Sequence, residues 1–211
     1  DVYVINTCSV TNMGDRKSRQ IIRRAKKLNP NAVIAVTGCY AQTAPDEVLA
    51  IEGVNLVLGT KDRKNIVTLV EELNTESNIN HVSDIMSNHE FEELQIKQYS
   101  NRTRAFIKIQ EGCNQFCSYC IIPYARGPVR SRAKDDVVRE IKELAHNGFK
   151  EIILVGIHVA SYGVDLGDTT LESLIMDVDK IDGVERIRLS SIEPMTLNQE
   201  FIDSIKDSKK L

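Results

Sequence analysis

Short apolar runs alternate with helical patterns through the first third of the chain. A run of four or five apolar residues bounded by turn residues is typical of a buried strand, whereas apolar positions at helical spacing indicate an amphipathic helix. Residues 11–28 and 61–73 predict helices. This alternation predicts a parallel sheet with helix-covered faces, and therefore an N-terminal α/β domain over residues 1–74. Three runs predict its strands: 2–5, 32–36 and 56–59.

A second strand–helix series follows a polar, aperiodic stretch. We interpret residues 75–101 as a linker, and residues 102–211 as a second domain with three βα units. A complete eight-stranded barrel of such units needs about 250 residues. The second domain therefore predicts at most the first half of a barrel, and we expect the chain to be a fragment cut at both ends. Its expected strands are 105–110, 152–155 and 186–189, and its expected helices are 134–147 and 171–181.

Two cysteines lie directly after predicted strands of the N-terminal domain. Cys8 follows the first strand and Cys39 follows the second. Ligands of open α/β sheets collect beyond the carboxyl ends of parallel strands. We expect both thiols to open onto this edge, and two buried structural thiols are the alternative.

Three further cysteines crowd into eight residues: Cys113, Cys117 and Cys120. A 4Fe-4S cluster normally takes four thiolates, so this loop supplies three and leaves one iron open. Zinc is the alternative, if His146 or His158 completes a tetrahedral site. The odd total of five cysteines does not favour a disulfide framework and indicates a reducing compartment, the cytoplasm.

Composition changes this picture mainly through the distribution of charge. The chain is 42% hydrophobic and 27% charged, as is common for globular proteins, and no apolar run is long enough to predict a membrane span. The formal charge is −3, yet seven basic residues lie between Asp15 and Leu28. Such a basic stretch on an acidic chain can bind phosphates; the alternative is a solvated helix face.

The cysteine loop resembles the signature of the radical S-adenosylmethionine (SAM) enzymes, with Tyr119 in the place of its aromatic residue. In that superfamily the open iron chelates SAM, and one electron from the cluster releases a 5′-deoxyadenosyl radical. The whole chain resembles the methylthiotransferases of the superfamily. Four stretches carry this resemblance: NTCSVTN (6–12), TGCYAQ (37–42), IQEGCNQFCSYCIIPYARGPVRSR (109–132) and GIHVASYG (156–163).

The resemblance implies the fold and the cofactors. Residues 102–211 would form the first half of a radical-SAM partial (β/α)6 barrel, whose cluster is held by Cys113, Cys117 and Cys120. The N-terminal domain would hold an auxiliary 4Fe-4S cluster through three cysteines. Two of them match Cys8 and Cys39, and the third has no counterpart in this chain.

The resemblance also implies residues that contact SAM. The backbone at Gly156, Ile157 and His158 would meet its methionine part, since glycine permits close backbone approach. Tyr119 would lie near the adenine, with core packing as the alternative. For the His158 side chain, the alternative is a satisfied polar residue at a strand end. Two residues at the third strand end are further candidates for cofactor binding: Ser190 and Glu193.

Family members insert a methylthio group at an unreactive C–H bond. Residues 10–12, 17–20 and 23–25 are most similar to the branch that modifies ring carbon 2 of N6-threonylcarbamoyladenosine beside the tRNA anticodon. Other branches act on isopentenyladenosine or on an aspartate of a ribosomal protein. The reaction requires an electron donor such as flavodoxin or ferredoxin, and no general acid or base. Four residues would meet tRNA phosphates: Arg16, Arg19, Arg23 and Lys27.

Two further classes of protein stay open from the sequence. One is a non-catalytic electron-transfer protein, which would need four cysteine ligands for each cluster. The other is a zinc-binding RNA module.

Overall fold

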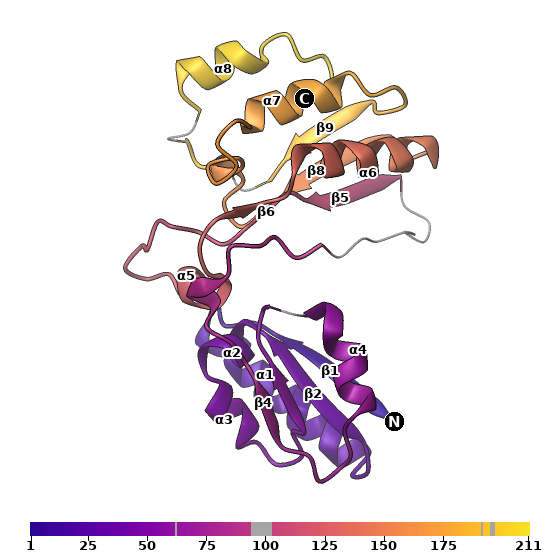
Figure 1. Cartoon of the computed structure of the whole chain (residues 1–211), viewed down its shortest axis with the longest axis vertical. Helices are drawn as coiled ribbons and strands as arrows, with labels where there is room; N and C mark the ends of the chain where they lie inside the picture. Colours follow the sequence, from indigo (N-terminus) through magenta and orange to yellow (C-terminus); the bar gives the residue numbers. More distant parts are fainter. Residues whose placement is uncertain (62, 94–102, 191, 195–196) are drawn as a thin grey trace. The chain divides into compact units, whose positions relative to one another are not determined.

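The computed structural model describes residues 1–61, 63–93, 103–190, 192–194 and 197–211. It divides into two compact units (Figure 1). The first comprises Asp1–Asn88 with Asn114–Pro128, and the second comprises His89–Cys113 with Val129–Leu211. The predicted linker falls partly on residues 94–101, and the expected domain start on residue 102, both outside the described ranges. Within those ranges, no helix is long and apolar enough to cross a membrane.

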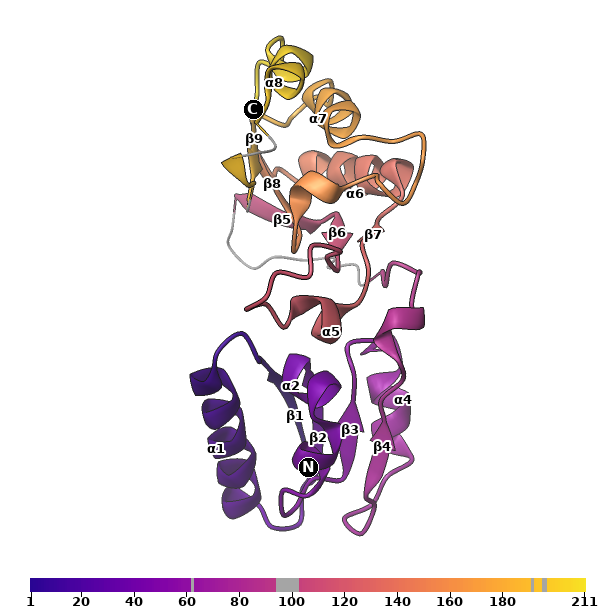
Figure 2. The ribbon, with the colours of Figure 1, turned by 90° about the vertical axis from the view of Figure 1, so that its left-hand side faces the viewer.

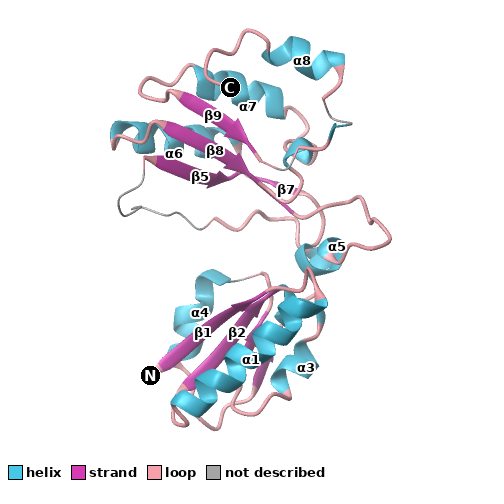
Figure 3. Ribbon diagram, turned by 180° about the vertical axis from the view of Figure 1, so that it is seen from behind, coloured by secondary structure: helices cyan, strands magenta, loops and turns pink. Residues whose placement is uncertain are grey.

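The first unit is built on a parallel sheet in the order β1-β2-β3-β4. Helix α1 covers one face of this sheet and α4 lies on the other face (Figure 2). Helix α3 lies on the same face as α1 (Figure 3). The mixed α/β fold predicted for this part of the chain is confirmed. Its strands are Val2–Thr7, Val33–Gly38, Leu56–Leu58 and Ile79–His81, and α1 to α4 are Asn12–Leu28, Cys39–Thr43, Pro45–Leu49 and Ile66–Glu71.

Helix α1 follows from local capping and from its apolar face. The side chain of Thr11 accepts a hydrogen bond from the backbone N–H of Gly14 at 3.1 Å, which satisfies one donor of the first turn. Ile22 and Ala25 are buried against the sheet, where they pack in one cluster with Ile34. The remaining faces of the helix carry the basic residues, which therefore stay at the surface.

Strand β4 lies in the stretch that we interpreted as a linker, and that part of the interpretation is wrong. All three residues of β4 are exposed, so the strand has no apolar pattern that sequence could reveal. Its position depends on Asn55, a buried side chain whose Nδ2 donates to the carbonyls of Thr75 at 3.0 Å and Ser77 at 3.1 Å. The backbone N–H of Ile79 then donates to the carbonyl of Asn55 at 3.0 Å.

The short helix α5 (Ile122–Arg126) comes after the cysteine loop and packs against α2 in the first unit. The hydroxyl of Thr60 donates to the carbonyl of Ala125 at 2.8 Å. Gln42 fixes Thr60 in turn, since its Oε1 accepts from the Thr60 backbone N–H at 2.9 Å. The end of the cysteine loop is thereby anchored to residues that follow β2 and β3.

The second unit has a parallel sheet in the order β5-β8-β9, formed by Arg104–Lys108, Glu151–Val155 and Arg186–Leu189. Helices α6 (Lys134–His146) and α7 (Leu171–Asp179) lie on the same side of it (Figure 3). The three predicted βα units are confirmed; the third ends in α8 (Gln199–Ile205). The core of this unit includes Ile107, Val137, Ile141, Ile152, Leu154, Leu174 and Ile175.

Two strands of two residues each were not predicted. Gln110–Glu111 forms β6 and Arg130–Ser131 forms β7, and they pair antiparallel with Glu111 opposite Arg130. This pairing joins the two ends of the segment that contains the three cysteines. Strands this short carry no sequence periodicity, so they escape pattern analysis.

We expect Asn55→Ala to destabilise the first unit by about 1–3 kcal/mol, because the buried N–H of Ile34, which donates to Asn55 Oδ1 at 2.9 Å, and the carbonyls of Thr75 and Ser77 lose their partner. Urea unfolding followed by circular dichroism would measure this change. Hydrogen exchange should also accelerate at residues 74–81. Asn31→Ala, at an exposed asparagine, is the matched control; equal exchange in both variants would contradict the role of Asn55.

Candidate functional site

The three cysteines of the loop are free thiols. Cys113 and Cys120 are half-buried and Cys117 is exposed. The backbone N–H of Cys120 donates to the carbonyl of Cys117 at 2.9 Å. In sequence, Phe116 lies between Cys113 and Cys117. Its φ is +45°, the one positive φ of a non-glycine residue in the described ranges. Its ring meets that of Tyr124 edge-on, with 5.8 Å between the ring centroids.

The donor chemistry of this loop fits an iron–sulfur cluster with one open iron, because three unbridged thiols occupy one accessible loop. Among the residues that the structure describes, no three His, Cys, Asp or Glu side chains lie close enough together to hold a metal ion. The structure thus presents the three thiols without gathering them. Tyr119 is 91% exposed, which excludes the core-packing alternative for its ring.

Gln110 connects the start of the cysteine loop with the end of β8. Its side chain is fully buried. Its Oε1 accepts from the backbone N–H of His158 at 2.8 Å, and its Nε2 donates to the carbonyl of Gly112 at 2.7 Å. A Cβ at Gly156 would come within 2.8 Å of the Gln110 Oε1, so glycine permits this close approach. Gln110 was not predicted as a site residue; its one signal is a polar residue at the end of the apolar strand expected at 105–110.

The structure brings His158 and Glu193 together as a pair. His158 is buried, and its Nδ1 lies 2.5 Å from the hydroxyl of Ser161. Its Nε2 lies 3.5 Å from Glu193 Oε2, and the two atoms form no hydrogen bond. Ser190 directly follows β9, and its backbone N–H donates to the carbonyl of Leu154 in β8 at 3.2 Å.

Charged side chains pair within and beside the β6–β7 pair. Glu111 and Arg130 are both buried, with 3.9 Å between Glu111 Oε2 and Arg130 Nη2. Lys108 Nζ lies 2.9 Å from the same carboxylate oxygen. Arg132 forms an ion pair with Glu140. Removing one partner from such a buried pair is costly, because it leaves the other charge uncompensated. The β6–β7 pairing that joins the two ends of the cysteine segment therefore depends on these ion pairs.

In the first unit, Cys8 and Cys39 follow directly after Thr7 and Gly38, which are paired residues of β1 and β2. The thiols therefore leave neighbouring strands at the same edge, as the sequence predicted. Gly38 has φ +99°, and a Cβ there would lie 2.4 Å from the carbonyl oxygen of Thr7. Cys39 is only 4% exposed, whereas Cys8 is exposed.

Arg126 contacts the buried thiol of this edge. Its Nε donates to the Sγ of Cys39 at 3.2 Å. The guanidinium comes from the last residue of α5, six positions after Cys120. Arg126 was not predicted as a site residue, because a contact across 87 positions leaves no local pattern.

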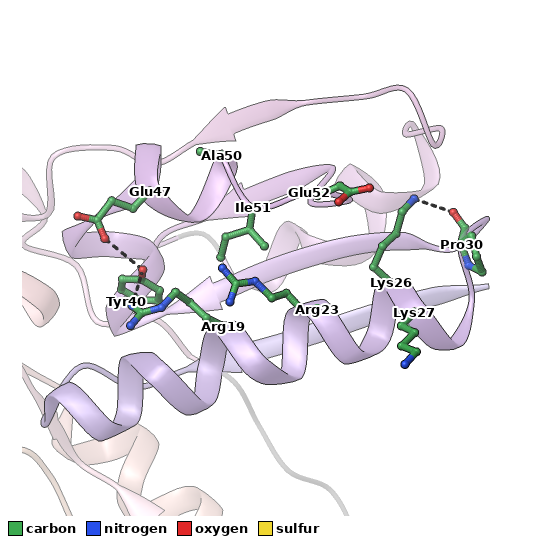
Figure 4. Close-up of a pocket in the computed structure, with 10 residues that line it drawn as sticks. All are labelled: Arg19, Arg23, Lys26, Lys27, Pro30, Tyr40, Glu47, Ala50, Ile51 and Glu52. Atoms are coloured by element: carbon green, nitrogen blue, oxygen red, sulfur yellow. Dashed lines mark hydrogen bonds between the residues drawn. The ribbon is translucent and has the colours of Figure 1, made fainter.

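Three of the four predicted phosphate-binding residues share a hollow beside α1: Arg19, Arg23 and Lys27 line it, and Arg16 does not (Figure 4). Lys26, which the sequence analysis did not select, lines it as well.

Comparison with known families assigns both parts of the chain. The profile described as "Uncharacterized protein family UPF0004" matches residues 1–59, and that of the Radical SAM superfamily matches residues 107–211.

Curated relatives match over the whole chain. "Threonylcarbamoyladenosine tRNA methylthiotransferase MtaB" of Bacillus subtilis (strain 168) is 50% identical over 213 residues, covering 100% of this chain and 47% of that protein. The protein of the same name from Aquifex aeolicus (strain VF5) is 42% identical, covering 100% and 52%. "tRNA-2-methylthio-N(6)-dimethylallyladenosine synthase" of Sulfurihydrogenibium sp. (strain YO3AOP1) is 36% identical, covering 98% and 48%. The chain spans about half the length of these relatives.

A solved structure is similar in fold. The radical S-adenosylmethionine methyltransferase TsrM from Kitasatospora setae, with tryptophan substrate and the SAM analogue aza-SAM bound, has a TM-score of 0.63 at 17% identity. The alignment covers 97% of this chain and 45% of that one. The resemblance drawn from the four sequence stretches is confirmed: residues 107–211 belong to the Radical SAM superfamily, and the chain is similar over its whole length to proteins named as tRNA methylthiotransferases.

Proposed function

We propose that the protein containing this chain is a radical SAM methylthiotransferase that modifies ring carbon 2 of N6-threonylcarbamoyladenosine beside the tRNA anticodon. The observation that carries the proposal is the loop of three free thiols within the region matched by the Radical SAM superfamily. Identity of 50% to a relative named for this nucleoside supports the choice of substrate.

In this proposal Cys113, Cys117 and Cys120 hold a 4Fe-4S cluster and leave one iron for SAM. When bound, the cluster and SAM together supply the radical that removes hydrogen from the substrate. Gln110 fixes the N–H of His158 and the loop at Gly112. Gly156 carries no side chain that would collide with Gln110. The other proposed SAM-binding residues are Tyr119, Ile157, Ser190 and Glu193.

An auxiliary 4Fe-4S cluster is part of the proposal, with Cys8 and Cys39 as two of its ligands. Their adjacent positions after paired strand residues support this role. Arg126 would act as a positioning residue, since its Nε–H already points at the sulfur of Cys39. Hydrogen bonds to ligand sulfurs raise the reduction potential of a cluster, because they stabilise its more electron-rich state.

The partners follow from the chemistry. An anticodon loop is single-stranded, so its bases can be splayed out and stacked in an active site. An electron donor such as flavodoxin or ferredoxin would reduce the cluster. Five free cysteines suit a reducing compartment, which is why we place the protein in the cytoplasm.

Isopentenyladenosine is the second candidate substrate. Relatives named for N(6)-dimethylallyladenosine match at 36–37% identity, below the 50% and 42% of two relatives named for threonylcarbamoyladenosine. Mass spectrometry of tRNA nucleosides from a strain lacking the intact gene separates the two, since only one methylthio nucleoside should disappear.

We expect Cys117→Ala in the intact protein to lose about four irons, the content of one cluster, and to restore no methylthio nucleoside in the deletion strain. Iron analysis after anaerobic purification and nucleoside mass spectrometry measure the two effects. Ser118→Ala, at the next position of the same loop, should keep both iron and activity. A Cys117→Ala protein with full iron content would refute the proposed ligand set.

We expect Gln110→Leu to weaken SAM binding by about tenfold or more while iron content is retained, because the N–H of His158 and the carbonyl of Gly112 lose a buried partner worth about 1–3 kcal/mol each. Equilibrium binding of SAM to the reconstituted protein provides the measurement. Gln115→Leu, at an exposed glutamine of the cysteine loop, is the control. Unchanged SAM affinity in Gln110→Leu would remove Gln110 from the site.

We expect Arg126→Met to lower the midpoint potential of the auxiliary cluster, because this substitution removes one N–H···S hydrogen bond to Cys39. A redox titration followed by electron paramagnetic resonance, in a Cys113→Ala background that lacks the radical cluster, isolates this signal. Arg126→Lys can still donate to the sulfur and should restore part of the shift. Identical potentials in all three proteins would show that Arg126 does not act on the cluster.

A further inference from the structure

Basic side chains of α1 line one wall of a hollow of about 1110 Å³ in the first unit (Figure 4). Four cations lie along this wall, at positions that place them on one side of the helix. The opposite wall comes from α2, α3 and the residues after α3, and it includes Tyr40, Glu47 and Ile51. The cations are Arg19, Arg23, Lys26 and Lys27.

One of these cations is held in place. Arg19 Nη1 donates to the hydroxyl of Tyr40 at 3.0 Å, and its guanidinium carbon lies 5.6 Å from the centroid of the Tyr40 ring. The Tyr40 hydroxyl donates in turn to Glu47 Oε2 at 3.1 Å. Arg19 therefore loses little side-chain entropy when it meets an anion, because its conformation is already fixed.

Two further cations of this wall, Arg23 and Lys27, can pair with a bound anion. In the part of the chain that the structure describes, neither Arg23 nor Lys27 forms an ion pair, and both are exposed. Figure 4 shows Arg23 extending toward Ile51 in the hollow. Lys26 reaches back along the helix end, where its Nζ donates to the carbonyl of Pro30 at 2.7 Å.

The row of cations is too long for a single phosphate. Arg19 and Lys27 are eight residues apart, so the row extends about 12 Å along the helix axis. A polyanion with regularly spaced charges can meet the whole row, whereas one phosphate group can meet only one end of it. The positive wall also stands out on a chain whose formal charge is −3.

We propose that this hollow, which we call the α1 groove, binds the sugar–phosphate backbone of the tRNA substrate. The proposal rests on the proposed function and adds the place where the RNA strand is held. Contacts of this kind fix the register of the RNA without reading its bases, and they make affinity fall as salt rises. The α1 groove includes Lys26 and excludes Arg16, which changes the set of residues expected from the sequence.

Glu52 gives the α1 groove a second testable feature. Its carboxylate lines the hollow together with the four cations, and a phosphate there meets like charge. Glu52→Gln removes this repulsion without changing the size of the side chain. We therefore expect Glu52→Gln to bind tRNA more tightly than the unaltered protein.

The decisive experiment compares two pairs of substitutions on the same helix in the intact protein. Arg23→Gln with Lys27→Gln removes two charges of the α1 groove, and Lys17→Gln with Arg24→Gln removes two exposed charges that do not line it. Binding of unmodified substrate tRNA is measured over a range of salt concentrations. Removing a cation that meets a phosphate reduces the slope of log affinity against log salt by about 1. We expect a decrease of about 2 and at least tenfold weaker binding for the groove pair, with little change for the control pair.

The outcomes separate this proposal from the proposed function. If the two pairs weaken binding equally, or if the groove pair keeps the original salt slope, the α1 groove is not the RNA site. A persisting methylthio nucleoside in the same strains would then leave the enzymatic proposal intact. If the unaltered protein neither restores the nucleoside nor binds tRNA, the proposed function itself fails.

Discussion

Parallel strand pairing is the constraint on which the chemistry of this chain depends. Because all strands of a parallel sheet run the same way, their carboxyl ends meet at one edge, where each chain turns into the next helix. In the first unit the pairing of Thr7 with Gly38 brings Cys8 and Cys39 to neighbouring positions. In the second unit the same rule places the segments after β5, β8 and β9 at one edge. Residues far apart in sequence become neighbours without any specific contact between them.

Buried polar side chains then fix the loops that follow these strands. Gln110 is fully buried, yet both ends of its amide have backbone partners, so its burial costs little and fixes two loops. Glu111 and Arg130 are buried as paired charges beside it. A pair of this kind contributes little net stability compared with apolar residues, but either charge alone would be costly to bury. The base of the cysteine segment is therefore held in one arrangement.

The predicted elements agree with the structure where apolar residues follow a regular period. Helices α1 and α6 and strands β1, β2, β8 and β9 lie close to their predicted bounds, because their buried faces carry that period. The common edge of Cys8 and Cys39 followed from the same reasoning.

The predictions fail where single polar side chains decide the structure through distant hydrogen bonds. Strand β4 depends on Asn55, about twenty positions away. The clamp at Gln110 joins residues 48 positions apart. The walls of the α1 groove likewise come from separate segments, which is why Lys26 was missed and Arg16 was included. No period within a window of about 15 residues can reveal such contacts.

The packing of α5 bears directly on how a methylthiotransferase could work. Such a reaction must generate a radical and deliver sulfur to the same substrate atom, so two sets of cysteines must be held in a constant relation. Within the first unit, Thr60 fixes the carbonyl of Ala125, and Arg126 donates to the thiol of Cys39. Cys117 and Cys120 precede this helix in the same compact unit as Cys8 and Cys39. Two thiols proposed for the radical cluster, Cys117 and Cys120, thus lie in the same compact unit as those proposed for the auxiliary cluster. The helix that follows them supplies the Arg126 side chain that donates to Cys39.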